Sequence, residues 1–248
     1  MVDDTNQTAD DAAVITRDEV VGRYLVDDRG IPSLRVNFIT SLDGAATHDG
    51  VSGGLNNADD KVVFDTLRML ADAIIVGAGT VRAEGYGGVK LDEDAVAWRR
   101  AHGLVPQPPV VIVSSRLDIE PRHPFFAHAV VRPIVVTHAA SPVDKRAALA
   151  DVADVLVCGA DDVDPAEMIA ALAARGYVQL LCEGGPHLFG TLIEADCVDE
   201  LCLSVSPVLE GGTAGRIASG GAQTSRAMRL LHAFPARDMV FLRYARKR

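Results

Sequence analysis

The chain has 248 residues, of which 48% are hydrophobic and 23% charged, a composition typical of a globular protein with a substantial core. Its 34 acidic residues outnumber its 24 basic ones, and the formal net charge of −10 disfavours a nucleic-acid partner because it repels phosphate backbones. No apolar run approaches the roughly 18–20 residues that span a bilayer, and the start MVDDTNQTADD is too acidic and polar for a signal peptide, so we expect a cytoplasmic protein with no membrane partner.

The order of segments predicts one α/β domain after a short tail. Residues 1–17 are rich in Asp and Thr, so we expect a flexible acidic tail before a single domain over residues 18–248. Apolar, β-branched runs predict strands at 34–40, 73–76, 110–113, 130–137, 155–157, 178–182, 201–208 and 239–244. Helical spacing of apolar residues predicts helices at 58–71, 92–101, 142–150, 165–174 and 187–195. This alternation predicts a mostly parallel central sheet flanked by helices, with the last two strands forming an antiparallel pair at an edge.

Three of the predicted strands end in residues that suit a bound ligand, which in open α/β sheets lies beyond the carboxyl ends of strands. Gly77-Ala78-Gly79-Thr80 and Glu183-Gly184-Gly185-Pro186 join a strand to a helix start, where glycines admit a ligand and free amides favour a phosphate. Ser114-Ser115-Arg116 offers hydroxyls and a guanidinium, which suit a phosphate monoester such as the 2′-phosphate of NADPH. Each of the three could equally be an ordinary turn.

Three carboxylates are candidates for catalysis. Asp43 ends the first strand in Ser41-Leu42-Asp43-Gly44, which also has the pattern of a plain β-turn. Asp60, Phe64 and Arg68 are spaced four apart on one helix face, which could be a pocket wall or an ordinary rim with an ion pair. Glu183 directly follows an apolar strand, and a buried carboxylate there costs free energy unless it has a partner.

Several other patterns do not make a site. Tyr86 and Lys90 have the spacing of the Tyr/Lys pair of short-chain dehydrogenases, but the glycines between them disfavour the helix that this pair needs. His123 and His128 lack further ligands, so we expect no metal site. The four cysteines form no C-x-x-C pair and sit in apolar segments, which indicates reduced core residues.

Taken together, four stretches resemble the reductase domain of riboflavin biosynthesis, which belongs to the dihydrofolate-reductase-like superfamily. They are NFITSLDGAA (37–46), LRMLADAIIVGAGTVRAEGYGGV (67–89), VVIVSSRL (110–117) and LLCEGGPHLFGTLIEADCVDELCLSVSPVLEGG (180–212). The resemblance implies a nine-stranded mixed sheet, a homodimer, NADPH as hydride donor, and a 5-amino-6-ribosylamino-pyrimidinedione 5′-phosphate as the substrate whose ribosyl group is reduced.

The resemblance also implies roles for individual residues. The substrate contacts are Ser52, Arg68, Gly88 and Glu183. The cofactor contacts are Ile39, Thr80, Glu84, Ser114 and the segment Gly185, Pro186, His187, Leu188, Phe189, Gly190 and Thr191; the strand-end motifs add Gly77, Gly79, Ser115, Arg116 and Gly184.

Two positions depart from the family pattern and keep the acceptor open. A family tryptophan is Gly54 here, and a second phosphate-binding arginine is Leu91, whose loss removes roughly 1.5–3 kcal/mol of phosphate recognition. The zinc-deaminase elements of bifunctional relatives are absent, so we expect no deamination. A diverged pterin or dihydrofolate reductase is therefore an alternative, and a non-catalytic nucleotide-binding protein is a further one.

Overall fold

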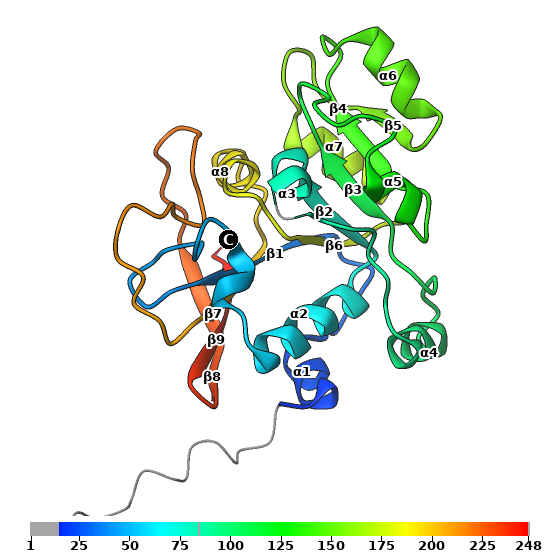
Figure 1. Ribbon diagram of the computed structural model, residues 1–248. Coiled ribbons are helices and arrows are strands. Elements are labelled where there is room, and N and C mark those ends of the chain that lie inside the picture. The colour runs from blue at the N-terminus through cyan, green and yellow to red at the C-terminus, as the bar shows by residue number, and fades with distance from the viewer. Residues whose placement is uncertain (1–14, 84, 248) are drawn as a thin grey trace, which may run out of the picture.

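The computed structural model describes residues 15–83 and 85–247, and within them nine strands form one sheet (Figure 1). The strands are β1 (Ser33–Thr40), β2 (Ala73–Gly77), β3 (Val110–Val113), β4 (Ile134–Thr137), β5 (Asp154–Val157), β6 (Gln179–Cys182), β7 (Glu200–Val205), β8 (Met228–Ala236) and β9 (Met239–Arg246). The helices are α1 (Arg17–Tyr24), α2 (Ala58–Leu70), α3 (Ala78–Ala83), α4 (Glu93–Ala101), α5 (Pro124–His128), α6 (Val143–Ala150), α7 (Pro165–Ala173) and α8 (Pro186–Glu194), with a 3₁₀ turn η1 (Ser52–Leu55).

The sheet has the order β5-β4-β3-β2-β6-β1-β7-β9-β8, and β5 through β7 are parallel. The predicted mostly parallel α/β sheet is therefore confirmed. The predicted antiparallel pair is also confirmed, because β7 pairs with β9 in the register Leu201↔Tyr244. β8, which the sequence did not indicate, pairs with β9 and takes the outer edge.

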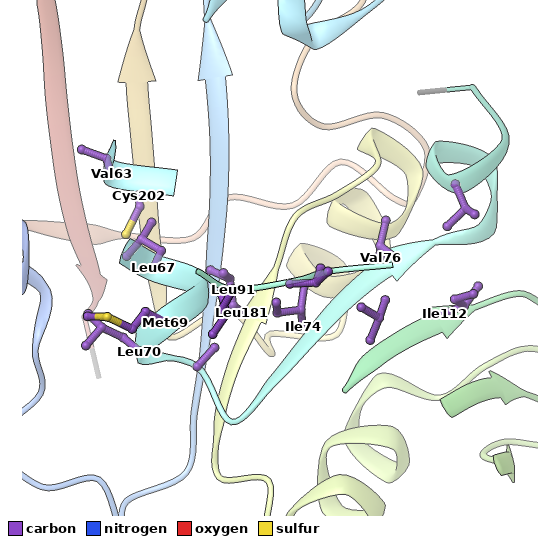
Figure 2. Packing of buried hydrophobic residues seen from close by; sticks show 14 of the residues in the cluster. Val63, Leu67, Met69, Leu70, Ile74, Val76, Leu91, Ile112, Leu181 and Cys202 are labelled. Atoms are coloured by element: carbon purple, nitrogen blue, oxygen red, sulfur yellow. The ribbon is translucent and has the colours of Figure 1, made fainter. Parts of the chain in front are cut away.

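Two apolar clusters hold the helices on the two faces of the sheet. Side chains at alternate strand positions point to opposite faces, so Ile74 belongs to one cluster and Ile75 to the other. Figure 2 shows the first cluster, where Leu67 of α2 lies beside Cys202 of β7 on the face that also carries Ile74. The second cluster packs α7 and α8 on the opposite face.

Three of the four cysteines are buried core residues, as predicted, whereas Cys197 is only partly buried. All four thiols are free. Burial raises the pKa of Cys182 to about 12 and that of Cys202 to about 11, so these thiols stay protonated and unreactive at neutral pH.

Three predicted boundaries differ from the structure by three or more residues. The folded part begins before residue 18, because Ile15 is buried and Thr16 caps α1 in a capping box; the predicted tail otherwise lies outside the described residues. β4 begins at Ile134 rather than residue 130, since Pro133 has no N–H to donate to a ladder. β7 ends at Val205 rather than 208, where Val208 N donates to Ser206 O and turns the chain.

The ends of the central strands are staggered, and this stagger creates the site. β1 pairs with β6 only from Ser33 to Val36, because β6 ends at Cys182 and the chain then turns into α8. The second half of β1, from Asn37 to Thr40, pairs with β7 alone. A gap therefore opens beside the end of β1, between α2, α3 and α8.

Candidate active site

A pocket of about 310 Å³ occupies this gap. Its walls come from β1, the loop after it, η1, α2, the start of α3 and the turn between β6 and α8. The residues that line it are Asn37, Phe38, Ile39, Ala46, Thr47, Ser52, Gly53, Asn56, Asp60, Phe64, Arg68, Thr80, Tyr86, Glu183, Gly185 and Pro186. The size suits a heterocycle or a nicotinamide ring, since small-molecule sites begin at roughly 300 Å³.

Glu183, Arg68 and Tyr86 form a closed polar cluster in the wall of the pocket. Arg68 Nε donates to Glu183 Oε1 at 2.7 Å, and Arg68 Nη2 donates to Glu183 Oε2 at 2.8 Å, which is a bidentate pair. The Tyr86 hydroxyl donates to Glu183 Oε2 and accepts from Arg68 Nη2 at 2.9 Å. The Glu183 side chain is only 2% exposed, so the carboxylate that the sequence singled out has the partners that its burial requires.

The charges of this cluster are fixed near neutral pH. Burial alone would lower the pKa of Arg68, but the Glu183 carboxylate outweighs it and raises that pKa further above its usual range. Burial, with the negative charge of Glu183, raises the pKa of Tyr86 well above its ordinary value. The guanidinium therefore stays charged and lies 4.1 Å from the centre of the Phe64 ring, which adds a cation–π contact.

Asp60 is a second buried carboxylate on the pocket wall, and it has a different environment. The residue is 5% exposed, and burial raises its pKa to about 6, against a smaller opposite effect of a hydrogen bond with Ser204. Among the described residues, no Lys, Arg or His nitrogen lies within 4.0 Å of its oxygens, in contrast to Glu183. Asp60 is thus a carboxylate that gains or loses a proton close to neutral pH and faces a space for a ligand.

Glycines shape the turn that faces these acids. The Gly184–Gly185 peptide bond is cis, and Gly184 has a φ of +102°, where a side chain would be strained and would meet the Phe38 ring. A Cβ on Gly185 would lie 2.5 Å from Thr80 Oγ1, so a side chain there would require Thr80 or the turn to shift. Gly185 is also the N-cap of α8 and provides no side-chain cap, so the amides that follow Pro186 in the first turn can bind an anion.

The comparisons with known proteins agree with this geometry. The family described as the RibD C-terminal domain matches residues 32–240 of the chain. The chain belongs to the RibD C-terminal domain family. The resemblance that the sequence motifs indicated is therefore confirmed.

Individual relatives of this family cover the chain to different extents. A 2,5-diamino-6-ribosylamino-4(3H)-pyrimidinone 5′-phosphate reductase of Archaeoglobus fulgidus is 30% identical over 182 residues, 73% of this chain and 83% of the relative. The riboflavin biosynthesis protein RibD of Mycobacterium tuberculosis is 30% identical over 185 residues, 74% of this chain, but the match spans only 44% of that longer protein.

Solved structures place the chain in the expected fold. A pyrimidine reductase-like protein of Corynebacterium diphtheriae has a TM-score of 0.81 and 26% identity, and the match covers 94% of this chain and all of that one. Dihydrofolate reductase of Enterococcus faecalis has a TM-score of 0.51 at 13% identity, covering 89% and 98% of the two chains, so it shows the fold alone. The dihydrofolate-reductase-like architecture is thereby confirmed.

Within this RibD-type fold, several residues expected at the site do line the pocket. They are Ile39, Ser52, Asp60, Arg68, Thr80, Glu183, Gly185 and Pro186. Gly77 N donates to Gly184 O at 2.7 Å, which ties the two glycine turns together. The sequence thus located both sides of the gap although they lie more than 100 residues apart.

Other expected site residues lie elsewhere, and the structure shows what they contact. Asp43 accepts from the backbone amides of Glu210 at 3.1 Å and Gly211 at 2.7 Å, outside the pocket wall. Gly88 packs against the backbone of His128 and Ala129 and does not line the pocket. Glu84 lies outside the described residues.

The two remaining cofactor segments are only partly open to a ligand. Ser114 is buried, and its amide donates to Val136 O of β4. Arg116 is exposed and pairs with Asp118 at 3.1 Å. In α8, Phe189 stacks on Phe38 with ring centres 5.0 Å apart. Of the other residues expected to contact the cofactor, Gly79, Ser115, His187 and Thr191 are at least partly accessible, Leu188 is half-buried, and Gly190 is buried.

Sequence reasoning missed four pocket residues of note: Tyr86, Asn37, Phe38 and Asn56. As the sequence predicts, no helix joins Tyr86 to Lys90, because α3 ends at Ala83. Its role comes instead from a contact with Glu183, 97 residues away, which no local pattern announces.

The two departures from the family pattern have structural consequences. Leu91 is buried in the first apolar cluster, so no cation from this position faces the pocket. At Gly54, a Cβ would lie 2.8 Å from the His48 ring, so a large side chain there requires His48 to move. Arg68 is consequently the only Lys, Arg or His among the described residues that line the pocket.

Proposed function

We propose that the chain is an NADPH-dependent reductase that acts on a ribosylaminopyrimidine 5′-phosphate, as in riboflavin biosynthesis. The observation that carries the proposal is the pocket itself: it joins a glycine turn with an uncapped helix start to two buried carboxylates of opposite character, Glu183 and Asp60. The similarity to the pyrimidinone phosphate reductase of Archaeoglobus supports a pyrimidinone phosphate as the acceptor.

The residues present fit a dinucleotide cofactor. Gly185 keeps open a space beside Thr80 that any side chain would fill, and the first amides of α8 suit a diphosphate. Ile39 lies on the pocket wall at the end of β1, where it would support the nicotinamide ring. When bound, NADPH supplies the hydride for the acceptor's carbon–nitrogen double bond.

We assign to Asp60 the stabilisation of the positive charge on the acceptor's nitrogen. The ring-opened acceptor would take up hydride as a protonated imine, whose positive charge a nearby carboxylate stabilises until the hydride neutralises it. Glu183 is already paired with the Arg68 guanidinium and hydrogen-bonded by Tyr86, and Asp43 lies outside the pocket wall, which leaves Asp60. Arg68 and Ser52, on the same wall, would position the substrate, and most of the acceleration would come from positioning and electrostatics.

A reductase of a pterin or dihydrofolate is the second candidate, and one observation favours it. Charge-assisted hydrogen bonds hold a phosphate ester most strongly, but Arg68 already pairs with Glu183 and position 91 is a buried leucine. A neutral bicyclic ring would not need the missing arginine.

The test is NADPH oxidation, followed at 340 nm, with purified protein and each acceptor in turn. The proposal predicts turnover with a ribosylaminopyrimidine 5′-phosphate and formation of its ribityl product. Turnover with dihydrofolate alone would support the second candidate, and no turnover with any acceptor would contradict both. NADH in place of NADPH is the control for the choice of cofactor.

Homodimerisation and a cytoplasmic location remain part of this proposal. The outer strand β8 has a free edge within the sheet order, and Leu230 on it is 47% exposed, which supports contact with a second copy. Sedimentation velocity at micromolar concentration should show a dimer, and a monomer would contradict it. Within the described residues, no helix is long and apolar enough to cross a membrane.

A further inference from the structure

The guanidinium of Arg68 has five N–H donors, and contacts within the pocket wall use three of them. Nε and Nη2 donate to the two oxygens of Glu183 at 2.7 and 2.8 Å, and Nη2 also donates to the Tyr86 hydroxyl at 2.9 Å. Nη1 makes no hydrogen bond to any of the described residues. Since Arg68 lines the pocket, the two N–H groups of Nη1 are the donors that it can offer to a ligand.

The direction of this nitrogen is set from three sides. An arginine side chain is long and has many rotamers, so contacts must fix where its free donors point. Glu183 holds one edge of the guanidinium, the centre of the Phe64 ring lies 4.1 Å from Cζ, and the Tyr86 hydroxyl accepts from the remaining N–H of Nη2. The hydroxyl also donates to Glu183 Oε2, so it braces both members of the ion pair at once.

Tyr86 has a support of its own, apart from the ion pair. Residues 85–88 are Tyr86 and three glycines, so the phenol is the side chain with which this segment reaches the pocket. Its ring packs beside Phe125, with the ring centres 6.5 Å apart. Gly88 lies so close to the backbone of His128 that a Cβ would be 2.6 Å from His128 O. Such a backing is what a residue needs in order to orient a neighbouring side chain.

We propose that Tyr86 is a positioning residue for the reduction: its hydroxyl turns Nη1 of Arg68 towards the substrate, where Nη1 binds an oxygen of that molecule. The inference rests on the proposed function and adds a residue to its machinery. Tyr86 does not serve as the acid of the reaction, because it donates its own proton to Glu183, and burial keeps the pKa of the phenol well above its ordinary value. It acts through Arg68, the single Lys, Arg or His of the described pocket wall.

Loss of the hydroxyl should loosen the ion pair without breaking it. In Tyr86→Phe, both hydrogen bonds between Arg68 and Glu183 can persist, and the ring can keep its place beside Phe125. One N–H of Nη2 then has no partner in the wall and competes with Nη1 for the substrate oxygen, while Glu183 Oε2 loses one of its two donors. Substrate binding should weaken by about tenfold, the effect of one misdirected charge-assisted hydrogen bond.

The experiment is steady-state kinetics at pH 7.5 with saturating NADPH and a ribosylaminopyrimidine 5′-phosphate as the varied substrate. Tyr86→Phe should raise KM about tenfold and change kcat by less than about twofold, since removing a contact made equally in the ground and transition states raises KM alone. NADPH affinity in a fluorescence titration should stay the same. Tyr177→Phe is the matched control: Tyr177 packs against the second apolar cluster, outside the pocket wall, and the variant should keep the wild-type KM and kcat.

A second substitution tests whether Tyr86 acts through Arg68. In Arg68→Lys the side chain keeps its charge but lacks the Nη1 that Tyr86 orients. Tyr86→Phe should therefore raise KM by less than about twofold in the Arg68→Lys background, against about tenfold in the wild type. Additive effects on KM would show that Tyr86 contributes on its own, and would overturn the positioning role.

The outcomes separate this inference from the proposed function. No turnover by wild type with the ribosylaminopyrimidine 5′-phosphate would overturn the proposed function, and the inference with it. Turnover by wild type with an unchanged KM in Tyr86→Phe would overturn the inference alone. A parallel loss of kcat or of NADPH affinity, or failure of Tyr86→Phe to fold, would assign Tyr86 a purely structural role and would also overturn it. The single variant decides the question if Arg68→Lys fails to fold.

Discussion

Replacing Glu183 by glutamine should test the polar cluster most severely. The carboxylate is 2% exposed and receives two donors from Arg68 and one from Tyr86. An amide keeps one acceptor oxygen but leaves the Arg68 guanidinium, itself 17% exposed, without its countercharge. Breaking a buried pair costs about 3–5 kcal/mol, and since Arg68 opens onto the pocket we expect the low end, about 3 kcal/mol.

The assay is urea unfolding of Glu183→Gln, of Tyr86→Phe and of the double variant. Tyr86→Phe should lower the free energy of unfolding by about 1–2 kcal/mol. The double variant should lower it by less than the sum of the two single effects, because both substitutions remove parts of one network. Glu120→Gln is the control, since Glu120 pairs with Arg122 at 2.5 Å with both side chains well exposed, and it should lose less than about 1 kcal/mol. If Glu183→Gln lowers the free energy of unfolding no more than Glu120→Gln does, the cluster of Glu183, Arg68 and Tyr86 does not stabilise the fold as described.

Four further predictions concern the acids and the glycine turn. The pKa of Asp60 is raised from 3.8 to about 6, so the folded state binds an extra proton and the free energy of unfolding falls as pH rises from about 4 to 6. Asp60→Asn should therefore be up to about 3 kcal/mol more stable than wild type in urea unfolding at pH 7.5, with little difference at pH 4. In the wild type, kcat/KM should rise through pH 6 as Asp60 ionises, and a flat profile between pH 5 and 7 would argue against its role. Gly185→Ala places a Cβ 2.5 Å from Thr80 Oγ1 and should weaken NADPH binding by about tenfold or more in a fluorescence titration, whereas unchanged affinity would place the cofactor elsewhere. Asp43→Ala should speed amide hydrogen exchange at Gly211 without abolishing turnover, and full loss of turnover in a folded variant would restore Asp43 to catalysis.

The strands that could be predicted from the sequence are those covered by helices on both faces of the sheet. The runs at 73–76 and 110–113 are continuous and apolar because both faces of β2 and β3 are covered by helices. β8 carries no such signal: it lies at the sheet edge, contains Pro235 and buries only Phe234, so its sequence resembles that of a loop. Helix α1 was missed for a similar reason, since it buries only Val20 and Tyr24 in an otherwise polar segment.

The candidate site was predictable where a motif is local. The glycine turns and the Asp60–Arg68 face depend on short spacings, and these residues do meet at the pocket. The sequence could not show that Glu183 would neutralise Arg68, because that contact joins residues 115 apart. The sequence around Asp43 is equally compatible with a catalytic acid, and only the structure shows that its carboxylate accepts from the backbone amides of residues 210 and 211. The hydrogen bond from Ser41, followed by these two, lowers the pKa of Asp43 to about 2.

Transfer of label from the cofactor is the most direct test of whether this pocket performs a reduction. The protein would be incubated with the 2-amino-ribosylaminopyrimidinone phosphate and NADPH deuterated at carbon 4, in separate 4R and 4S preparations, and the product examined by mass spectrometry. The account predicts one deuterium in the ribityl product from one of the two preparations. Product without deuterium from both, or no product at all, would contradict it.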